Sequence, residues 1–285
     1  MERTRRIATW TGAVLGLFCA LLLNSVLAHA QDGNGTVVTE EFHHTYPLAA
    51  NGRIELQNIN GDVHITEWDQ NQVKVDAVKR AEDNEGLKDA EIRVDASASS
   101  ISIETHYREH EDHWPHHNSA SVEYTLMVPR NATLDEVKLI NGEFDVTGVN
   151  GAVRASCING KLLAQALGGE AKLSTINGPL DVTFSRLGSQ SIELSSVNGS
   201  VDLTLPSDAK ASIEANTVHG GIDNNFGLHT NDHRWVGHDL RGDLAGGGVE
   251  IRLHNVNGRI DIHHAADGKV ISPAKDTGEH REGSV

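Results

Sequence analysis

The sequence is poor in cysteine, in aromatic residues and in basic residues, and these shortages exclude several kinds of protein. It has two cysteines in 285 residues. Cys19 lies in an N-terminal apolar run, so Cys157 has no partner for an intrachain disulfide. Lys and Arg number 24 against 40 Asp and Glu, and the formal net charge is −16. Nucleic acid and anionic lipid repel such a chain, so we expect neither as a partner.

Familiar catalytic motifs are also missing. The chain contains no GxSxG elbow, no P-loop and no HExxH zinc motif. Aromatic residues are 4% of the sequence, whereas enzymes that cleave polysaccharides use aromatic rings to stack sugars. We therefore expect no catalytic residues and no cofactor beyond weak divalent metal binding.

The first thirty residues read as a signal peptide. A basic start, MERTRR, precedes a 17-residue apolar run and the small-x-small sequence Ala28-His29-Ala30, which is the order of a secretory leader. We expect cleavage before Gln31, export to the periplasm or the cell surface, and no membrane insertion afterwards. Loss of three arginines and one glutamate takes the formal charge from −16 to about −18.

A short motif recurs along the rest of the chain: an apolar residue, two small or polar residues, Ile or Val, Asn-Gly, then apolar residues at alternate positions. Asn-Gly between alternating segments is a strong signal for a tight turn between strands, because both residues tolerate positive φ. We assign these pairs a structural role in turns, at Asn141-Gly142, Asn159-Gly160, Asn177-Gly178, Asn198-Gly199 and Asn257-Gly258.

The spacing of the motif predicts the architecture. Successive motif glycines lie eighteen residues apart from Gly160 to Gly178 and twenty-one apart from Gly178 to Gly199 and from Gly199 to Gly220. One such unit offers about five apolar side chains worth ~1.5–3 kcal/mol each, against ~1–2 kcal/mol per ordered residue. It must therefore share a core with its neighbours. We predict an all-β fold of parallel β-solenoid coils; the alternative is an antiparallel meander of Asn-Gly hairpins.

The prediction divides the mature chain into three parts. Residues 31–135 form a β-rich N-terminal part that caps one end of the coils, and KRAEDNEGLKDAEI within it carries a short helix or a loop. Residues 136–265 form the repeat region, with an inserted loop at 224–247. Residues 266–285 are polar and are expected to form a disordered tail.

The repeats resemble a known family. The segments ITEWDQNQVKVDA, VEYTLMVPRNATLDEVKLINGEFDV and GGGVEIRLHNVNGRIDI, together with the Asn-Gly repeats, look like the bacterial "putative adhesin" domain family over about residues 38–265. The resemblance implies an exported, non-catalytic β-solenoid and brings no established site residues. The high histidine content of this chain departs from the family pattern.

Histidines supply the candidate metal ligands. The segment HYREHEDHWPHH holds five imidazoles with acidic residues between them, ligands that suit Zn²⁺, Ni²⁺ or Cu²⁺. A solvated loop explains the same segment without a metal. A second group, His229, His233 and His238, would join this site if the two segments met in space. The first group comprises His106, His110, His113, His116 and His117.

Three further patterns have a structural and a functional interpretation. Asp145, Asp181, Asp202, Asp223 and Asp261 share one repeat position, so stacked strands would form an acidic column, either a solvated face or a Ca²⁺ collector. Cys157 shares a column with small polar residues and is expected to be packed and unreactive. Arg241-Gly242-Asp243 spells a cell-attachment tripeptide in the expected loop.

Three functions follow, in order of preference. The first is a non-catalytic, adhesin-like binding or structural module of the cell envelope, with an unidentified protein or glycan partner. The second is a periplasmic metal-binding protein that uses the histidine-rich segments. The third is a carbohydrate-active enzyme. The sequence leaves the oligomeric state open.

Overall fold

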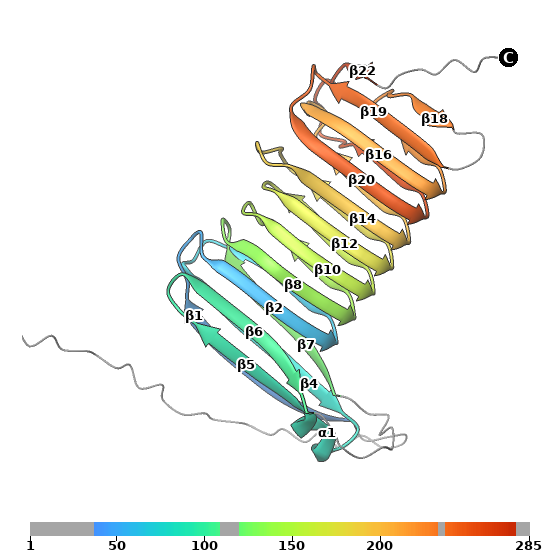
Figure 1. The fold of residues 1–285 in the computed structure, drawn as a ribbon. Helices are drawn as coiled ribbons and strands as arrows, with labels where there is room; N and C mark the ends of the chain where they lie inside the picture. Colours follow the sequence, from blue (N-terminus) through green and yellow to red (C-terminus); the bar gives the residue numbers. More distant parts are fainter. Residues whose placement is uncertain (1–36, 109–119, 233–236, 278–285) are drawn as a thin grey trace, which may run out of the picture.

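The computed structural model describes residues 37–108, 120–232 and 237–277, and nearly all of their regular structure is β-strand. Strands stack like rungs along one long axis (Figure 1). The single helix of the described ranges, α1 (Asn84–Asp89), begins where the Asp83 carboxylate accepts a hydrogen bond from the Gly86 amide. It lies in the segment where a short helix or a loop was predicted.

The strands form two sheets. Sheet A has ten strands, in the spatial order β1 (Val38–Pro47), β4 (Gln72–Ala81), β7 (Ser121–Pro129), β3 (Val63–Trp68), β9 (Phe144–Thr147), β11 (Leu162–Leu167), β13 (Leu180–Phe184), β15 (Val201–Leu205), β21 (Ile260–His264) and β17 (Ile222–Asn224).

Sheet B has twelve strands. Eleven follow the spatial order β18 (Thr230–Asp232), β19 (His238–Leu244), β16 (Ala211–His219), β20 (Val249–Asn257), β14 (Ile192–Asn198), β12 (Ala171–Asn177), β10 (Val153–Asn159), β8 (Thr133–Asn141), β2 (Arg53–Asn60), β6 (Ser100–Tyr107) and β5 (Ala90–Ala96). The twelfth, β22 (Ala274–Asp276), pairs with β19.

The chain alternates between the sheets through the middle of the molecule. β10, β12 and β14 lie side by side and parallel in sheet B, and the strands that follow them, β11, β13 and β15, do the same in sheet A. The predicted all-β fold with parallel strands is confirmed. The alternative meander is wrong, because each Asn-Gly pair joins strands of different sheets and not a hairpin within one sheet.

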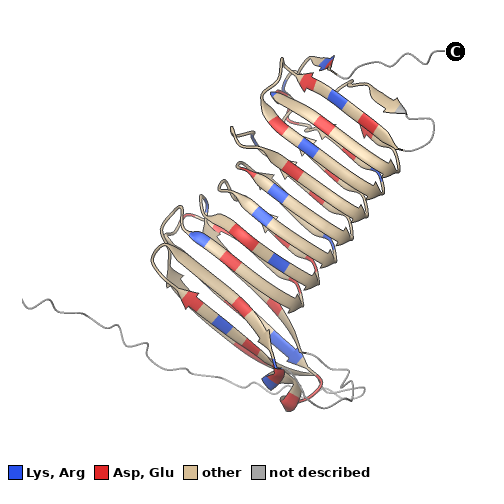
Figure 2. Ribbon diagram, in the orientation of Figure 1, with Lys and Arg blue, Asp and Glu red and all other residues tan. Residues whose placement is uncertain are grey.

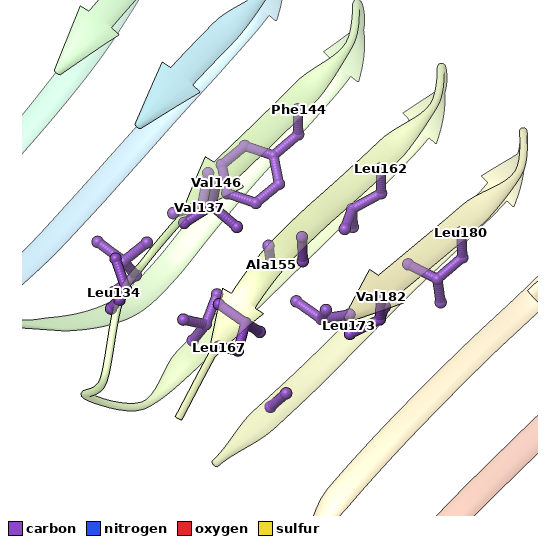
Figure 3. Packing of buried hydrophobic residues seen from close by; sticks show 14 of the residues in the cluster. Leu134, Val137, Phe144, Val146, Ala155, Leu162, Leu167, Leu173, Leu180 and Val182 are labelled. Carbon is purple, nitrogen blue, oxygen red and sulfur yellow. The ribbon is translucent and has the colours of Figure 1, made fainter. Parts of the chain in front are cut away.

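Alternating apolar side chains from the two sheets meet in one core. Leu162 and Leu180 point inward from sheet A, and Ala155 and Leu173 point inward from sheet B (Figure 3). Leu162 and Leu180 have no exposed surface, and burial of such a side chain stabilises the fold by about 1.5–3 kcal/mol. The apolar residues at alternate positions point into this core, with one shift: Ala166 has a φ of 54°, and Leu167 is the residue in register with Phe184.

The spatial order of the strands departs from the chain order at both ends. β20 and β21 lie between β14–β15 and β16–β17, and β2 and β3 lie between β6–β7 and β8–β9. Gly220 therefore does not stack directly on Gly199, the motif glycine that precedes it in the sequence. Gly258 lies against Gly199, and Gly220 lies against Gly258. The repeat pattern fixes the shape of each unit but not the position that it takes in the stack.

Antiparallel strands finish each end of the stack. At the N-terminal end, β4 pairs antiparallel with β1 and β7, and β5 pairs antiparallel with β6. At the C-terminal end, β19 pairs antiparallel with β16, β18 and β22. The segment 224–247, expected to be an inserted loop, thus contributes β18 and β19. Within the expected tail, β22 pairs with β19, and the buried Ser272 hydroxyl donates to the Ala209 carbonyl at 2.6 Å.

Candidate binding faces

The corner asparagines form a continuous row of side-chain hydrogen bonds, which we call the amide ladder. Asn159 Nδ2 donates to Asn141 Oδ1 at 2.9 Å, and Asn177 Nδ2 donates to Asn159 Oδ1 at 2.8 Å. The same bond recurs at each step, because parallel register sets equivalent corners side by side. The ladder runs through Asn60, Asn141, Asn159, Asn177, Asn198 and Asn257.

The corner glycines are required by their backbone and by close packing. Gly160 has a φ of 154°, and a Cβ at this position would lie 1.9 Å from the Gly142 carbonyl oxygen. The two corners lie this close because the Gly142 amide donates to the Asn159 carbonyl at 3.1 Å. These Asn-Gly pairs lie where the chain passes from a strand of sheet B to a strand of sheet A.

Inside the corner, small polar side chains bind the glycine carbonyls of the neighbouring unit. Thr175 Oγ1 donates to the Gly160 carbonyl at 3.4 Å, and Cys157 Sγ lies 3.4 Å from the Gly142 carbonyl. Cys157 is buried, and burial raises the pKa of its thiol to about 11. The structure thus places Cys157 in a packed environment, and its low reactivity stays a prediction.

Charged residues lie in register across the strands of sheet B (Figure 2), at positions that alternate with the buried apolar ones. Lys172 Nζ lies 2.9 Å from Glu193 Oε2 on the next strand, and Arg154 pairs with Asp135 at 2.6 Å and with Glu170 at 2.9 Å. Such exposed pairs contribute about 0–1 kcal/mol to stability. Their row crosses six strands, through Arg154, Lys172, Glu193, Arg252, Glu214 and Arg241.

The predicted aspartate column lies on sheet A. Asp181, Asp202, Asp261 and Asp223 are in register on four adjacent strands, and Leu163 separates them from Asp145. Burial raises the pKa of the Asp261 carboxyl, and Arg259, at 2.8 Å, opposes that shift. In the described part of the chain, no group of three or more His, Cys, Asp or Glu side chains has a geometry that could hold a metal ion.

The described members of the two histidine groups lie at opposite ends of the molecule. His106 is on β6, near one edge of sheet B, whereas His229 precedes β18 and His238 begins β19 at the other edge. Eight strand steps at about 4.8 Å separate β6 from β19, a span of roughly 38 Å. His106 is therefore not brought to His229 and His238. Outside the described residues lie His110, His113, His116, His117 and His233.

His106 contributes to a cavity of about 520 Å³ at the N-terminal end, which Glu40, Glu91 and Arg108 also line. The buried Lys79 ammonium reaches this cavity, where it donates to the Leu87 and Ala90 carbonyls and pairs with Glu40 at 3.0 Å. Because these contacts use its donors, Lys79 ties α1 and β5 to β4 and is not available to a ligand.

The tripeptide Arg241-Gly242-Asp243 lies within β19 and not in a loop. Gly242 is buried and pairs with Ile213 on one side and Asp276 on the other. Ser212 Oγ donates to Asp243 Oδ1 at 2.7 Å. The expectation of loop presentation is wrong, because this segment extends the stack as a paired strand.

The sequence interpretation missed an exposed aliphatic row beside the amide ladder. The residue before each asparagine of the amide ladder is Ile or Val and points outward from sheet B, as Ile158 and Ile176 do, and Val218 before His219 holds the equivalent position on β16. The recurring Ile or Val of the motif was the available signal. We call this row the aliphatic ladder; in spatial order it comprises Ile59, Ile140, Ile158, Ile176, Val197, Val256 and Val218.

No helix in the described ranges is long and apolar enough to cross a membrane. No protein-family model matches the chain, and no curated protein does.

Solved structures resemble the chain at low identity. A "putative cell adhesion protein" from Clostridium sporogenes is 14% identical, with 79% of this chain and all of that chain covered and a TM-score of 0.47. A "putative adhesin" from Bacteroides fragilis is 12% identical, with 79% and 97% covered and a TM-score of 0.28. One from Parabacteroides merdae is 8% identical, with 82% and 98% covered and a TM-score of 0.30.

Proposed function

We propose that this chain is an exported, non-catalytic β-solenoid, an adhesin-like binding or structural module of the cell envelope. The observation that carries the proposal is the repetition of outward side chains at a fixed step across many strands. The charged row of sheet B presents Lys172, Glu193 and Arg252 on three successive strands. Such a surface suits an extended protein or glycan, which makes many weak contacts of the same kind.

Two features of the molecule support a scaffold for binding and not for chemistry. The core is continuous and aliphatic, so both sheets hold their outer faces rigid. The second feature is that charged groups with shifted pKa values are held in ion pairs within the sheets. The Arg154 guanidinium, whose pKa is raised, pairs with Asp135 and Glu170 on neighbouring positions of sheet B. Asp76, whose pKa is lowered, lies on sheet A and is bound by Lys74 and His43.

Binding to a panel of glycans and extracellular proteins tests the proposal. The chain from Gln31 is immobilised, and its affinity is compared with that of a Lys172→Glu, Arg252→Glu variant, which reverses two charges of the row. A control variant, Thr183→Glu, places a charge on the outer face of sheet A. We expect a ligand whose binding falls with the first variant and not with the control. Hydrolysis of a panel glycan by the wild-type chain would instead support the enzyme hypothesis.

Export has its own test. Expressed in a bacterial host, the full chain should appear outside the cytoplasm with Gln31 as its first residue, as intact mass and N-terminal sequencing would show. A chain that stays in the cytoplasm with residues 1–30 attached contradicts the exported role.

Metal binding is the second candidate, favoured by the five histidines between His106 and His117. Calorimetric titration with Zn²⁺, Ni²⁺ and Cu²⁺ compares the mature chain with a variant in which His110, His113, His116 and His117 are changed to Ala. Sub-micromolar binding that is lost in the variant supports this candidate. Absence of heat with all three metals eliminates it.

A further inference from the structure

The aliphatic ladder is an apolar strip on an otherwise polar face. Its seven residues are between 36% and 43% exposed, the extremes being Ile59 and Ile176. Ile158 lies beside Ile176, because Cys157 pairs with Thr175 and Asn159 with Asn177. Seven rungs at about 4.8 Å give a straight strip roughly 29 Å long.

The rows on either side of the strip carry no formal charge near its centre. Two residues back along each strand lie Ser156, Ser174 and Ser195, which are in register with one another. On the other side lies the amide ladder, whose side-chain donors already bind the neighbouring asparagine. A partner that covers this strip therefore desolvates few charged groups, which keeps the cost of binding low.

Strand propensity alone does not explain why every residue of the strip is apolar. A β-branched residue suits an outward strand position, but Thr meets that preference as well as Ile or Val and keeps the surface polar. All seven rungs are Ile or Val. Together they form an apolar strip on the scale of the largest patches of ordinary monomers, about 300–600 Å², which often mark interaction sites.

We propose that the aliphatic ladder is the interface between two copies of this chain. The spacing of its rungs is set by strand pairing, so a partner that contacts every rung must present apolar groups at the same step. A second copy does so by construction, and a two-fold axis makes such a contact self-complementary. This inference goes beyond the proposed envelope function and does not depend on it.

An antiparallel arrangement of the two ladders has favourable charge contacts. Ile176 is the central rung and faces its own counterpart in the second copy, while the strands on either side of it, β10 and β14, face each other. Arg154 on β10 then lies opposite Glu193 on β14 of the second copy, in both directions, and Lys172 on β12 lies opposite its own counterpart. Around the central rung, two Arg–Glu contacts thus outnumber one Lys–Lys contact, and the balance of charge favours the pairing that brings the apolar rungs together.

The surface area that the contact buries sets the expected affinity of the dimer. A stable dimer buries about 800 Å² per partner, so the strip must be covered together with the serine row and the amide ladder beside it. Because the contact is mainly apolar, added salt should not dissociate it, and screening of the net negative charge should favour it.

Sedimentation equilibrium of the chain from Gln31, across micromolar concentrations and at low and high salt, tests the proposal. We expect a reversible dimer that high salt does not weaken. Ile176→Lys places two ammonium groups against each other at the centre and should raise the dissociation constant at least about tenfold. The control Thr183→Lys adds the same charge to the outer face of sheet A in the same unit and should leave the dimer intact.

A cross-linking experiment locates the contact. Ile176→Cys should give a disulfide-linked dimer under mild oxidation, whereas Thr183→Cys should not, and the native thiol of Cys157 is buried. Circular dichroism confirms that each variant is folded. A wild-type chain that stays monomeric overturns the proposal. So does a dimer that Ile176→Lys leaves unchanged, since its interface must then lie elsewhere.

Discussion

Tyr124 on β7 and Thr105 on β6 share a buried hydrogen bond that joins sheet A to sheet B, with 2.7 Å between Oη and Oγ1. Tyr124 has no exposed surface, and Thr105 is 4% exposed. Burial raises the pKa of the Tyr124 phenol above its ordinary range, so the hydroxyl stays protonated and able to donate. The bond satisfies both groups where no solvent reaches them.

Removing one partner of this bond should destabilise the protein more than removing both. Tyr124→Phe leaves the Thr105 hydroxyl buried without its partner, at a cost of about 1–3 kcal/mol in the free energy of unfolding. Tyr124→Phe combined with Thr105→Val leaves no unsatisfied group and should recover part of that loss. Urea unfolding of the two variants and the wild type measures the difference. A double variant less stable than Tyr124→Phe would show that the bond is not the cause.

Breaking the amide ladder in the middle should cost twice as much as breaking it at its end. Asn159 donates to Asn141 and accepts from Asn177, whereas Asn60 accepts from Asn141 alone along the ladder. At about 0.5–1.5 kcal/mol for each bond, Asn159→Ala should lower the free energy of unfolding by roughly 1–3 kcal/mol and Asn60→Ala by half as much. Equal losses in urea unfolding would show that turn conformation, and not the ladder, accounts for the asparagines.

Much of the fold follows from local patterns that the sequence displays directly. The Asn-Gly pairs mark the corners, and apolar residues at alternate positions, such as Leu173 and Leu194, mark the inward columns. Both features repeat because each unit has the same shape. Their combination predicts parallel stacking, since a unit of this size cannot hold a core of its own.

The order of the stack was not predictable from those patterns. The unit that contains Gly258 fits between the units of Gly199 and Gly220, yet its motif suits any position in the stack. The choice depends on long-range contacts with β19, which pairs antiparallel with β16 and covers its outer edge. The recurring Ile or Val of the aliphatic ladder can be read from the sequence, but its exposure cannot, because it depends on which face of sheet B each strand turns outward.

The close packing of the corners predicts that a single methyl group disrupts the stack. In Gly160→Ala, the new Cβ meets the Gly142 carbonyl oxygen at 1.9 Å, and the backbone has a φ of 154°. We expect a loss of more than about 2 kcal/mol, because the left-handed region alone costs roughly 1–2 kcal/mol and the clash adds to it.

Gly221→Ala is the matched control for that substitution. Gly221 follows a corner glycine, and a Cβ placed on it meets no heavy atom within 4 Å. Its melting temperature should stay near that of the wild type, whereas that of Gly160→Ala should fall by several degrees. Equal melting temperatures for the two variants would contradict the packing at the corner.

The buried thiol of Cys157 predicts how the mature chain reacts with thiol reagents. Burial raises the pKa of this group to about 11, and the thiolate is the reactive species. Its sulfur also lies 3.4 Å from the Gly142 carbonyl, inside the corner. In the chain from Gln31, iodoacetamide at pH 8 should therefore label Cys157 slowly in the folded protein and rapidly in 6 M urea, as intact mass would show.

Cys157→Ser keeps a hydroxyl donor for that carbonyl and should unfold near the wild-type midpoint, while Cys157→Ala loses the donor and should be less stable. Rapid labelling of the native chain at pH 8 would show that the corner opens far more often than its packing predicts.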